Sequence, residues 1–352
     1  VHALRIGPVR IAGGGQGRLD AGLDVRAGGL EGGRGKGPAL DRRHLRRPDP
    51  DRRHAAGQGL GVGVGDAGVG QDVLGDVAGA GEGGLADRVD LGRPLQWDGK
   101  SQGAWSDEAA SAGAVINLAG ENIGDGRWTA ARKQRLIESR VNATRALVEA
   151  MRSRPQHPRV FVSASGVNFY GPRGDDELDE NAGRGQGFLS DLTARWEEEA
   201  HAADSVARVV IFRFGVVIGR GGGALAKMLL PFKLGLGGRI SSGQQWMSWI
   251  ARDDVVRLIE WAISHADVRG TYYGTAPRPV RYREFTSALA RALHRPAIFP
   301  IPALALKAGF GQMAEETLLT GQRAVPTRAQ QQGFRFEHET VDSALQHALR
   351  RR

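Results

Sequence analysis

The chain has 352 residues, a formal net charge of +9 and no cysteine, which excludes disulfides, thiol catalysis and cysteine metal sites. Its densest basic run, residues 42–47, lacks interleaved aromatic side chains, so we expect no nucleic-acid partner. No apolar run is long enough to cross a bilayer, and the first residues do not resemble a signal peptide. We therefore expect a cytoplasmic protein with no membrane partner.

The first 94 residues use a restricted alphabet. Apart from Ile6, Ile11 and Lys36, they contain only residue types whose codons begin with G or C, and Gly and Arg dominate. A gene rich in G and C at third codon positions gives this alphabet when it is read in the wrong frame. We therefore expect residues 1–94 to be an out-of-frame or antisense translation, with the authentic sequence starting near Leu95. So much glycine and so little aromatic mass predict disorder without a packed core.

One stretch of this segment, residues 63–68, fits the pattern G-x-G-x-x-G. In a dinucleotide-binding fold this pattern follows a strand and opens a helix, where backbone amides take up the cofactor pyrophosphate. We expect neither an apolar strand before it nor an amphipathic helix after it. A chance match is therefore the favoured interpretation, and a working phosphate loop is the alternative.

Apolar strands alternate with amphipathic helices after the first segment. Residues 114–120, 160–162 and 209–212 are short, continuous apolar runs that predict buried strands. A stripe at helical spacing, from Ile137 to Met151, predicts a helix that begins near Thr129. Such alternation indicates an α/β fold, with a parallel sheet that is covered by helices on both faces.

Short helices rich in Ala and Leu follow from about residue 296. We expect them near residues 302–310, 313–319 and 341–349, in a small, mainly helical C-terminal domain that packs on the sheet domain. Ligands of parallel sheets bind beyond the carboxyl ends of the strands. The candidate site therefore gathers the residues that follow the predicted strands, which are 117–121, 163–170 and 213–223.

Several motifs after the first segment support a family resemblance. They are residues 115–121, Arg127-Trp128-Thr129, Ser163-Ala164-Ser165, Tyr170-Gly171, 243–250, Asp253-Asp254, 320–323 and Gly333-Phe334. Together they resemble the epimerase-like atypical branch of the short-chain dehydrogenase/reductase superfamily, with its C-terminal domain of unknown function. The resemblance implies a Rossmann-like, doubly wound domain at 95–295, without its usual first βαβ unit, and the smaller domain at 296–352. It also implies NADP or NAD as cofactor and a small-molecule substrate, with nucleotide-linked compounds among the candidates.

The wider superfamily uses a Ser and a Tyr-x-x-x-Lys pair, in which Lys lowers the pKa of Tyr so that its hydroxyl can transfer a proton near neutral pH. Residues 188–197, where the pair would fall, contain neither Tyr nor Lys. Ser165 follows a predicted strand at the place of the family's Ser. Tyr170 is the candidate for a substitute acid. The favoured alternative is that its ring packs the loop while its hydroxyl meets solvent or backbone.

Residues that follow the strands are assigned to the cofactor, namely Asn117, Ala119, Gly120, Ser163 and Arg213. Asn117 belongs to a cofactor loop or, equally, caps the end of its strand. Arg213 stands where a cation suits a phosphate or carboxylate. A salt bridge with a local acid is its alternative role.

Five residues are assigned to the substrate, namely Glu121, Arg127, Gln245, Trp246 and Trp249. Solvent exposure is the alternative for Glu121, and simple packing is the favoured interpretation of the neighbouring Trp128.

No metal site is expected. Asp253 and Asp254 are adjacent acids that are expected to cap a helix, and no His lies near them in sequence.

The chain departs from the family at Phe169, Ala251 and Tyr273-Gly274, where Tyr, His and Asn-Leu are usual. We therefore expect an NAD(P)-dependent, epimerase- or oxidoreductase-like protein of unknown substrate. The alternatives are a non-catalytic nucleotide-binding protein, or an inactive product without a cofactor loop.

Overall fold

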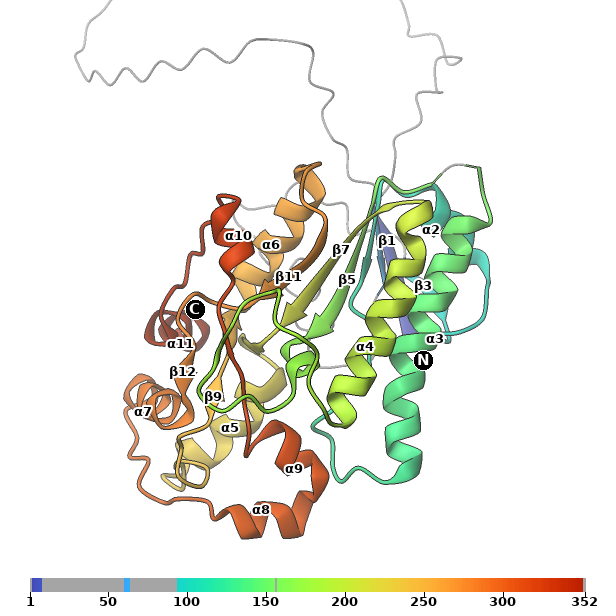
Figure 1. The fold of residues 1–352 in the computed structure, drawn as a ribbon. Helices are drawn as coiled ribbons and strands as arrows, with labels where there is room; N and C mark the ends of the chain where they lie inside the picture. Colours follow the sequence, from blue (N-terminus) through green and yellow to red (C-terminus); the bar gives the residue numbers. More distant parts are fainter. Residues whose placement is uncertain (1, 8–59, 64–93, 156, 351–352) are drawn as a thin grey trace, which may run out of the picture. The chain divides into compact units, whose positions relative to one another are not determined.

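The structure is a computed structural model that describes residues 2–7, 60–63, 94–155 and 157–350 (Figure 1). A seven-stranded sheet has the order β11-β7-β5-β4-β2-β1-β3. Its strands are β1 His2–Gly7, β2 Leu60–Gly63, β3 Pro94–Trp97, β4 Ala114–Asn117, β5 Val160–Gly166, β7 Arg208–Phe214 and β11 Gly270–Gly274. The five neighbouring strands β11, β7, β5, β4 and β2 pair in parallel. Strand β1 pairs antiparallel with both of its neighbours, β2 and β3. The predicted parallel sheet is confirmed.

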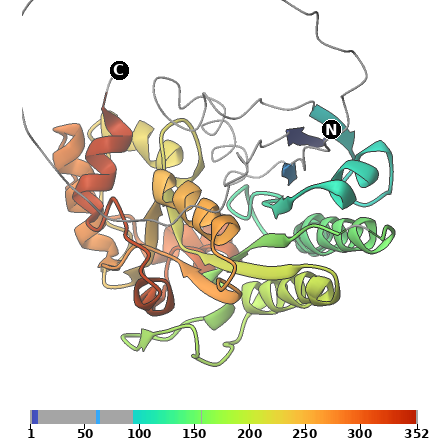
Figure 2. The same ribbon diagram turned by 90° about the horizontal axis from the view of Figure 1, so that it is seen from above.

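Helices cover both faces of the sheet. On one face lie α2 Ala104–Ser111, α3 Ala130–Arg152 and α4 Phe188–His201, with α3 and α4 side by side (Figure 2). On the other face lies α6 Arg252–Ser264. Side chains alternate along β5, so that Phe161 packs with one set of helices and Val162 with the other. This alternation explains why the strand is apolar throughout.

The predicted helix boundaries agree closely with those observed. Thr129 is the N-cap of α3, because its hydroxyl accepts the backbone N–H of Arg132 at 3.2 Å. The helix ends at Arg152, before Pro155. The strands β5 and β7 extend beyond their apolar runs to Gly166 and Phe214. This extension places Ser165 and Arg213 inside the sheet rather than in the loops that follow it.

The region after β7 forms shorter elements. They are β8 Val216–Ile218, α5 Gly223–Lys233, β9 Trp246–Met247, β10 Trp249–Ala251, β12 Val280–Arg281, α7 Tyr282–Leu293, α8 Ala303–Phe310, α9 Gln312–Thr317, β13 Arg323–Ala324, α10 Thr327–Gln331 and α11 Val341–Leu349. Between β5 and β7 lie the 3-10 helices η2 Val167–Tyr170 and η3 Ala202–Ser205, and the short strand β6 Glu177–Leu178. The region after residue 296 is mainly helical, as predicted.

The C-terminal helices share their cores with the sheet region. Leu345 of α11 packs in one cluster with Leu289 of α7 and Trp249 of β10, whereas Phe334 packs on the sheet with Tyr272. No helix in the described ranges is long and apolar enough to cross a membrane.

Part of the first segment contributes to the sheet. We expected no strand before the motif at residues 63–68, and this expectation is wrong, since β2 pairs in parallel with β4 and ends at Gly63. The expectation of disorder falls mostly on residues 8–59 and 64–93, which lie outside the described residues.

Candidate functional site

Three polar side chains form a row across the carboxyl ends of neighbouring strands. Ser165 of β5 is in register with Arg213 of β7, and Arg213 is in register with Tyr273 of β11. Residues in register on parallel strands project from the same face of the sheet. Strand pairing therefore brings these three side chains together, although long segments separate them in the sequence.

The centre of this group is Glu197, which α4 supplies from the covering layer. One carboxylate oxygen, Oε1, accepts hydrogen bonds from Ser165 Oγ at 2.6 Å and from Arg213 Nε at 2.8 Å. The other, Oε2, accepts one from Arg213 Nη2 at 2.6 Å. The exposed fraction is 5–6% for all three residues. This is a buried, bidentate ion pair with the serine hydroxyl attached to it.

Tyr170, at the end of η2, completes the network. Its hydroxyl accepts a hydrogen bond from Arg213 Nη1, and its ring lies edge-on to Tyr273, with 5.4 Å between ring centroids. Burial raises the pKa of Tyr170, although the charge of Arg213 opposes this change. The side chain is fully buried, so the alternative of a hydroxyl that meets solvent does not hold. The ring of Tyr170 is therefore packed inside the protein, and its hydroxyl meets Arg213 rather than solvent.

Arg213 is enclosed on every side. Its guanidinium lies 3.5 Å from the ring centroid of Phe169 and hydrogen-bonds to Glu197 and Tyr170. The alternative role, a salt bridge with a local acid, is therefore the arrangement observed. Each guanidinium nitrogen donates one hydrogen bond inside the protein, so the phosphate or carboxylate that the sequence analysis assigned to Arg213 would have to compete with Glu197 and Tyr170 for it.

Sequence reasoning missed Glu197 as a site residue. It lies in the run Glu197-Glu198-Glu199, which reads as a solvated face. The available signal was spacing, because Glu197 follows Thr193 by four residues and Leu189 by eight, on the buried side of the helix. An acid on an apolar stripe needs a buried partner.

A second polar group follows β4. The amide of Asn117 is fully buried, with Nδ2 donating to Thr144 Oγ1 at 2.8 Å and to Ser163 Oγ at 3.4 Å. Its Oδ1 accepts the backbone N–H of Ala119 at 3.2 Å. These contacts match the alternative in which Asn117 caps its strand, and they also fix the turn that leads to Gly120.

Charged side chains of α3 surround this turn. A Cβ at Gly120 would lie only 2.9 Å from Cζ of Arg140, so a larger residue there would have to displace this guanidinium. Arg140 donates to the carbonyl of Glu121 at 3.0 Å, and burial lowers its pKa to about 10. The side chain of Glu121 forms an ion pair with Arg132. Within the described part of the chain, Glu121 Oε2 and Arg132 Nε are buried without hydrogen-bond partners.

The residues assigned to the substrate are dispersed. Trp246 donates from Nε1 to Asp175 at 3.0 Å, and the guanidinium of Arg281 lies 4.0 Å from its ring centroid. Gln245 is used internally, because its Nε2 donates to the carbonyl of Leu318 at 2.8 Å. Trp246 thus contacts the loop after Tyr170, whereas Gln245 hydrogen-bonds to the C-terminal region.

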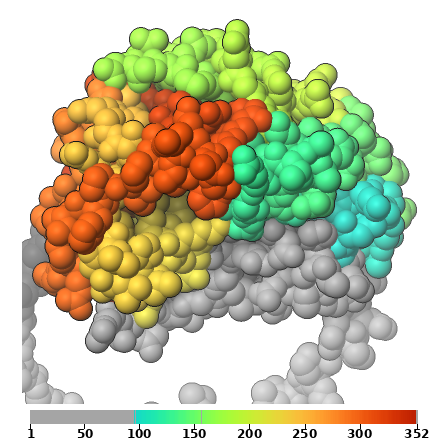
Figure 3. Space-filling view, turned by 90° about the horizontal axis from the view of Figure 1, so that it is seen from below, coloured from blue at the N-terminus to red at the C-terminus, as the bar shows by residue number. Residues whose placement is uncertain are grey.

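Two other expectations need correction or refinement. Trp249 is fully buried in a core cluster and donates to the carbonyl of Arg278 at 3.0 Å, so its side chain is a packing element rather than a pocket wall. Arg127 is exposed and donates to the carbonyl of Ala308 at 3.1 Å. It connects the start of α3 with α8, which lies beside this part of α3 in the surface view (Figure 3). Trp128 packs against Phe188, as favoured.

Comparisons with known proteins agree with this architecture. The model of the NAD dependent epimerase/dehydratase family matches residues 86–273, more than half of the chain, and a domain of unknown function, DUF1731, matches residues 301–348. An epimerase family protein of Mycobacterium bovis is 40% identical over 258 residues, which are 73% of this chain and 85% of that protein. The human epimerase family protein SDR39U1 is 38% identical over 247 residues, with 68% and 84% covered.

Solved structures share this fold. The crystal structure of human epimerase family protein SDR39U1 (isoform 2) with NADPH has a TM-score of 0.67 and 33% identity, with 80% of this chain and 95% of that chain covered. MoeE5 in complex with UDP-glucose and NAD has a TM-score of 0.63 at 18% identity, which supports the fold alone. The resemblance drawn from the sequence motifs is thereby confirmed. This chain belongs to the NAD dependent epimerase/dehydratase family.

Proposed function

We propose that this protein binds NADP(H) or NAD(H) and acts as an epimerase- or oxidoreductase-like enzyme on a small molecule, with nucleotide-linked compounds as the first candidates. The observation that carries the proposal is the buried network of Ser165, Glu197, Arg213 and Tyr170 at the carboxyl ends of β5 and β7. Ligands of doubly wound sheets bind at this edge. The NADPH in the human relative, which is 33% identical, supports NADPH as the cofactor to test first.

The residues present fit a polar cofactor at the turn after β4. Asn117 fixes the turn, Gly120 keeps it close to α3, and buried polar atoms of Glu121 and Arg132 lack partners among the described residues. We assign Asn117, Ala119, Gly120 and Ser163 to the walls of the cofactor site. The nicotinamide would supply or accept a hydride at a substrate carbon. The pyrophosphate would need the loop at residues 63–68, which lies outside the described residues except for Gly63.

Ser165 is our candidate catalytic residue. Its hydroxyl donates to Glu197, whose negative charge is stabilised by Arg213, so the serine oxygen keeps its lone pairs to accept a hydrogen bond from a substrate hydroxyl. Glu197, Arg213 and Tyr170 are positioning residues, because they act through Ser165. This assignment replaces the candidate acid role of Tyr170.

The test is NADPH titration by fluorescence of the chain with its upstream frame restored, followed by turnover assays on a panel of carbonyl compounds and nucleotide-linked sugars. We expect Ser165→Ala to bind NADPH as the wild type does and to lose turnover by about 100-fold or more, as expected for an essential proton-transfer group. Ser111→Ala, on the exposed side of α2, is the matched control. Equal turnover in the two variants would remove Ser165 from the mechanism.

A non-catalytic nucleotide-binding protein is the second candidate. It is favoured by residues 188–197, which lack the Tyr-x-x-x-Lys pair, and by the buried ion pair that engages Arg213 with Glu197. Saturable NADPH binding without turnover on the whole panel would favour this second function.

We also propose that residues 1–94 are translated out of frame. Their restricted alphabet supports this, whereas the parallel pairing of β2 just before residues 63–68 supports a working phosphate loop. Reading the nucleotide sequence upstream of the Leu95 codon in all frames tests the proposal directly. We expect the chain as written to lack NADPH binding and a chain with the frame restored to bind it. Micromolar NADPH binding by the chain as written would show that its own loop works.

A further inference from the structure

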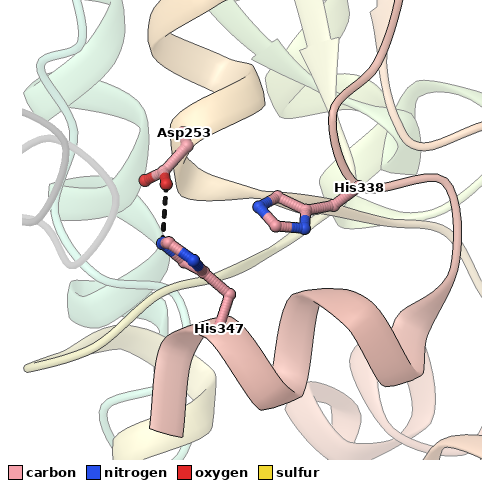
Figure 4. Close-up of side chains that lie close together, drawn as sticks. All are labelled: Asp253, His338 and His347. Atoms are coloured by element: carbon pink, nitrogen blue, oxygen red, sulfur yellow. Dashed lines mark ion pairs between the residues drawn. The ribbon is translucent and has the colours of Figure 1, made fainter. Parts of the chain in front are cut away.

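Two histidines and an aspartate from separate segments converge on the side of the molecule where α6 meets α11. Asp253 lies in the first turn of α6, His338 precedes α11, and His347 lies in its last turn (Figure 4). One potential ligand atom from each residue lies within 4.8 Å of the other two. Their side chains point toward a common centre, outside the candidate site described above.

His338 has a buried nitrogen that nothing in the described chain satisfies. The residue is 6% exposed, and its Nε2 has no hydrogen-bond partner among the described residues. Its other ring nitrogen, Nδ1, lies 2.9 Å from Ser343 Oγ. When Nδ1–H donates to that oxygen, Nε2 carries a lone pair directed toward the other two side chains. A metal-bound histidine is usually held in this way by a second partner.

The backbone that carries His338 is fixed by the residue next to Asp253. The fully buried carboxylate of Asp254 accepts the backbone N–H of Glu337 at 2.7 Å and that of His338 at 2.9 Å. Adjacent residues of α6 therefore supply one ligand and hold the loop that supplies another. Such a site is organised before any ion binds.

The other two ligands leave the site open to ions. His347 Nε2 lies 2.8 Å from Asp253 Oδ2, and the side chains are 51% and 38% exposed. The rings of His338 and His347 have centroids 4.9 Å apart. An ion can enter from solvent, and small rotations of the exposed side chains suffice to direct all three atoms at it.

We propose that Asp253, His338 and His347 bind a zinc ion, with water as the fourth ligand. Imidazole nitrogen and carboxylate oxygen are typical zinc ligands, and a set with two imidazoles disfavours magnesium and calcium. The ion satisfies the buried Nε2 of His338, which has no hydrogen-bond partner among the described residues. It also joins α11 to the first turn of α6, so that zinc stabilises the C-terminal helix against the sheet region.

The experiment uses the full chain, freed of metal by a chelator and without an affinity tag. Zinc chloride is titrated by calorimetry into the wild type and into His347→Gln, His338→Gln and His201→Gln. His201 is the matched control, because it pairs with Asp204 at 3.0 Å but belongs to no three-ligand group among the described residues. Since His347 is half exposed, its variant is expected to fold, and this is checked by circular dichroism.

We expect His347→Gln to weaken zinc binding by about 100-fold or more, beyond the roughly 10–100-fold that loss of an outer partner costs. His201→Gln should bind as the wild type does. Zinc should raise the Tm of the wild type and of His201→Gln, but not that of His347→Gln. Cobalt should give the visible absorption of a four-coordinate site only in the wild type and the control. Zinc affinities within tenfold for His347→Gln and the wild type, or an equal Tm rise with magnesium chloride, would overturn the proposal.

Discussion

The two polar clusters of this protein differ in how completely their hydrogen bonds are made. In the first, Glu197 is shared between Ser165 and Arg213, and each guanidinium nitrogen of Arg213 has a partner. In the second, His338 keeps a buried Nε2 without a partner among the described residues. A buried polar group that lacks a hydrogen bond is costly, so it indicates a ligand, whereas a satisfied network indicates a rigid support.

The largest expected effect comes from breaking the satisfied network. Glu197→Ala leaves Arg213 charged and buried without a counterion, which should lower the free energy of unfolding by about 3–5 kcal/mol. Urea denaturation followed by circular dichroism measures it. Glu198→Gln, at the next and exposed position of α4, is the control and should change little. Similar losses in the two variants would contradict the role given to Glu197.

Removing both charges sharpens the same test. A double variant, Glu197→Leu with Arg213→Met, replaces the buried ion pair by apolar side chains of similar size. Such replacements are often neutral or stabilising, so the double variant should recover most of the stability that Glu197→Ala loses. If it is instead less stable than Glu197→Ala, then the ion pair itself contributes more than its burial costs.

A smaller effect is expected at the edge of the network. Tyr170→Phe removes the hydroxyl that accepts from Arg213 Nη1, and it should cost about 1–3 kcal/mol, the usual range for leaving a buried donor unsatisfied. Tyr282→Phe is a useful comparison, because that tyrosine is also buried but belongs to another core cluster. NADPH affinity should not change if Tyr170 acts through Arg213 alone.

The cost of Tyr170→Phe should also depend on pH. Burial raises the pKa of Tyr170 in the folded state, so the unfolded chain ionises first as pH rises. Its contribution to stability is therefore present below pH of about 10 and is lost as pH rises through the folded pKa. Urea denaturation of both proteins at neutral and alkaline pH should give a smaller difference at alkaline pH. A difference that grows with pH would contradict the raised pKa.

The second cluster can be weakened without removing a ligand. Ser343→Ala removes the hydroxyl that faces His338 Nδ1, and it should weaken zinc binding by roughly 10–100-fold while the fold is kept. Calorimetric titration with zinc chloride measures it. Ser287→Ala, on the exposed side of α7, is the control. Unchanged zinc affinity would show that the hydroxyl does not orient the ring.

The smallest effect is expected two residues from Glu197 on the same helix. Glu199 pairs with Arg145, whose side chain is 51% exposed. Glu199→Gln should therefore cost about 0–1 kcal/mol, as for other solvent-exposed ion pairs, and less in high salt. Urea denaturation at low and high salt measures it. A cost as large as that of Glu197→Ala would mean that burial does not distinguish the two carboxylates.

The sequence by itself determined the class of fold and much of its layout. Continuous apolar runs placed β4, β5 and β7, and helical spacing placed the start of α3 near Thr129, one residue from its observed start at Ala130. Local patterns sufficed because burial on both faces and capping depend on neighbours in the sequence. Because both residues were predicted to lie at the carboxyl ends of strands, the sequence also predicted that Ser165 and Arg213 lie close together, as observed.

Only the tertiary structure decided which side chains complete each cluster. Glu197 comes from a covering helix, and the next two residues, Glu198 and Glu199, are also acids, so composition did not distinguish it. Asp253 had no histidine near it in sequence, and chain folding brought His338 and His347 to it across α7 and the C-terminal region. Periodicity tells which side of a helix is buried, whereas the partner across the interface depends on how separate segments pack.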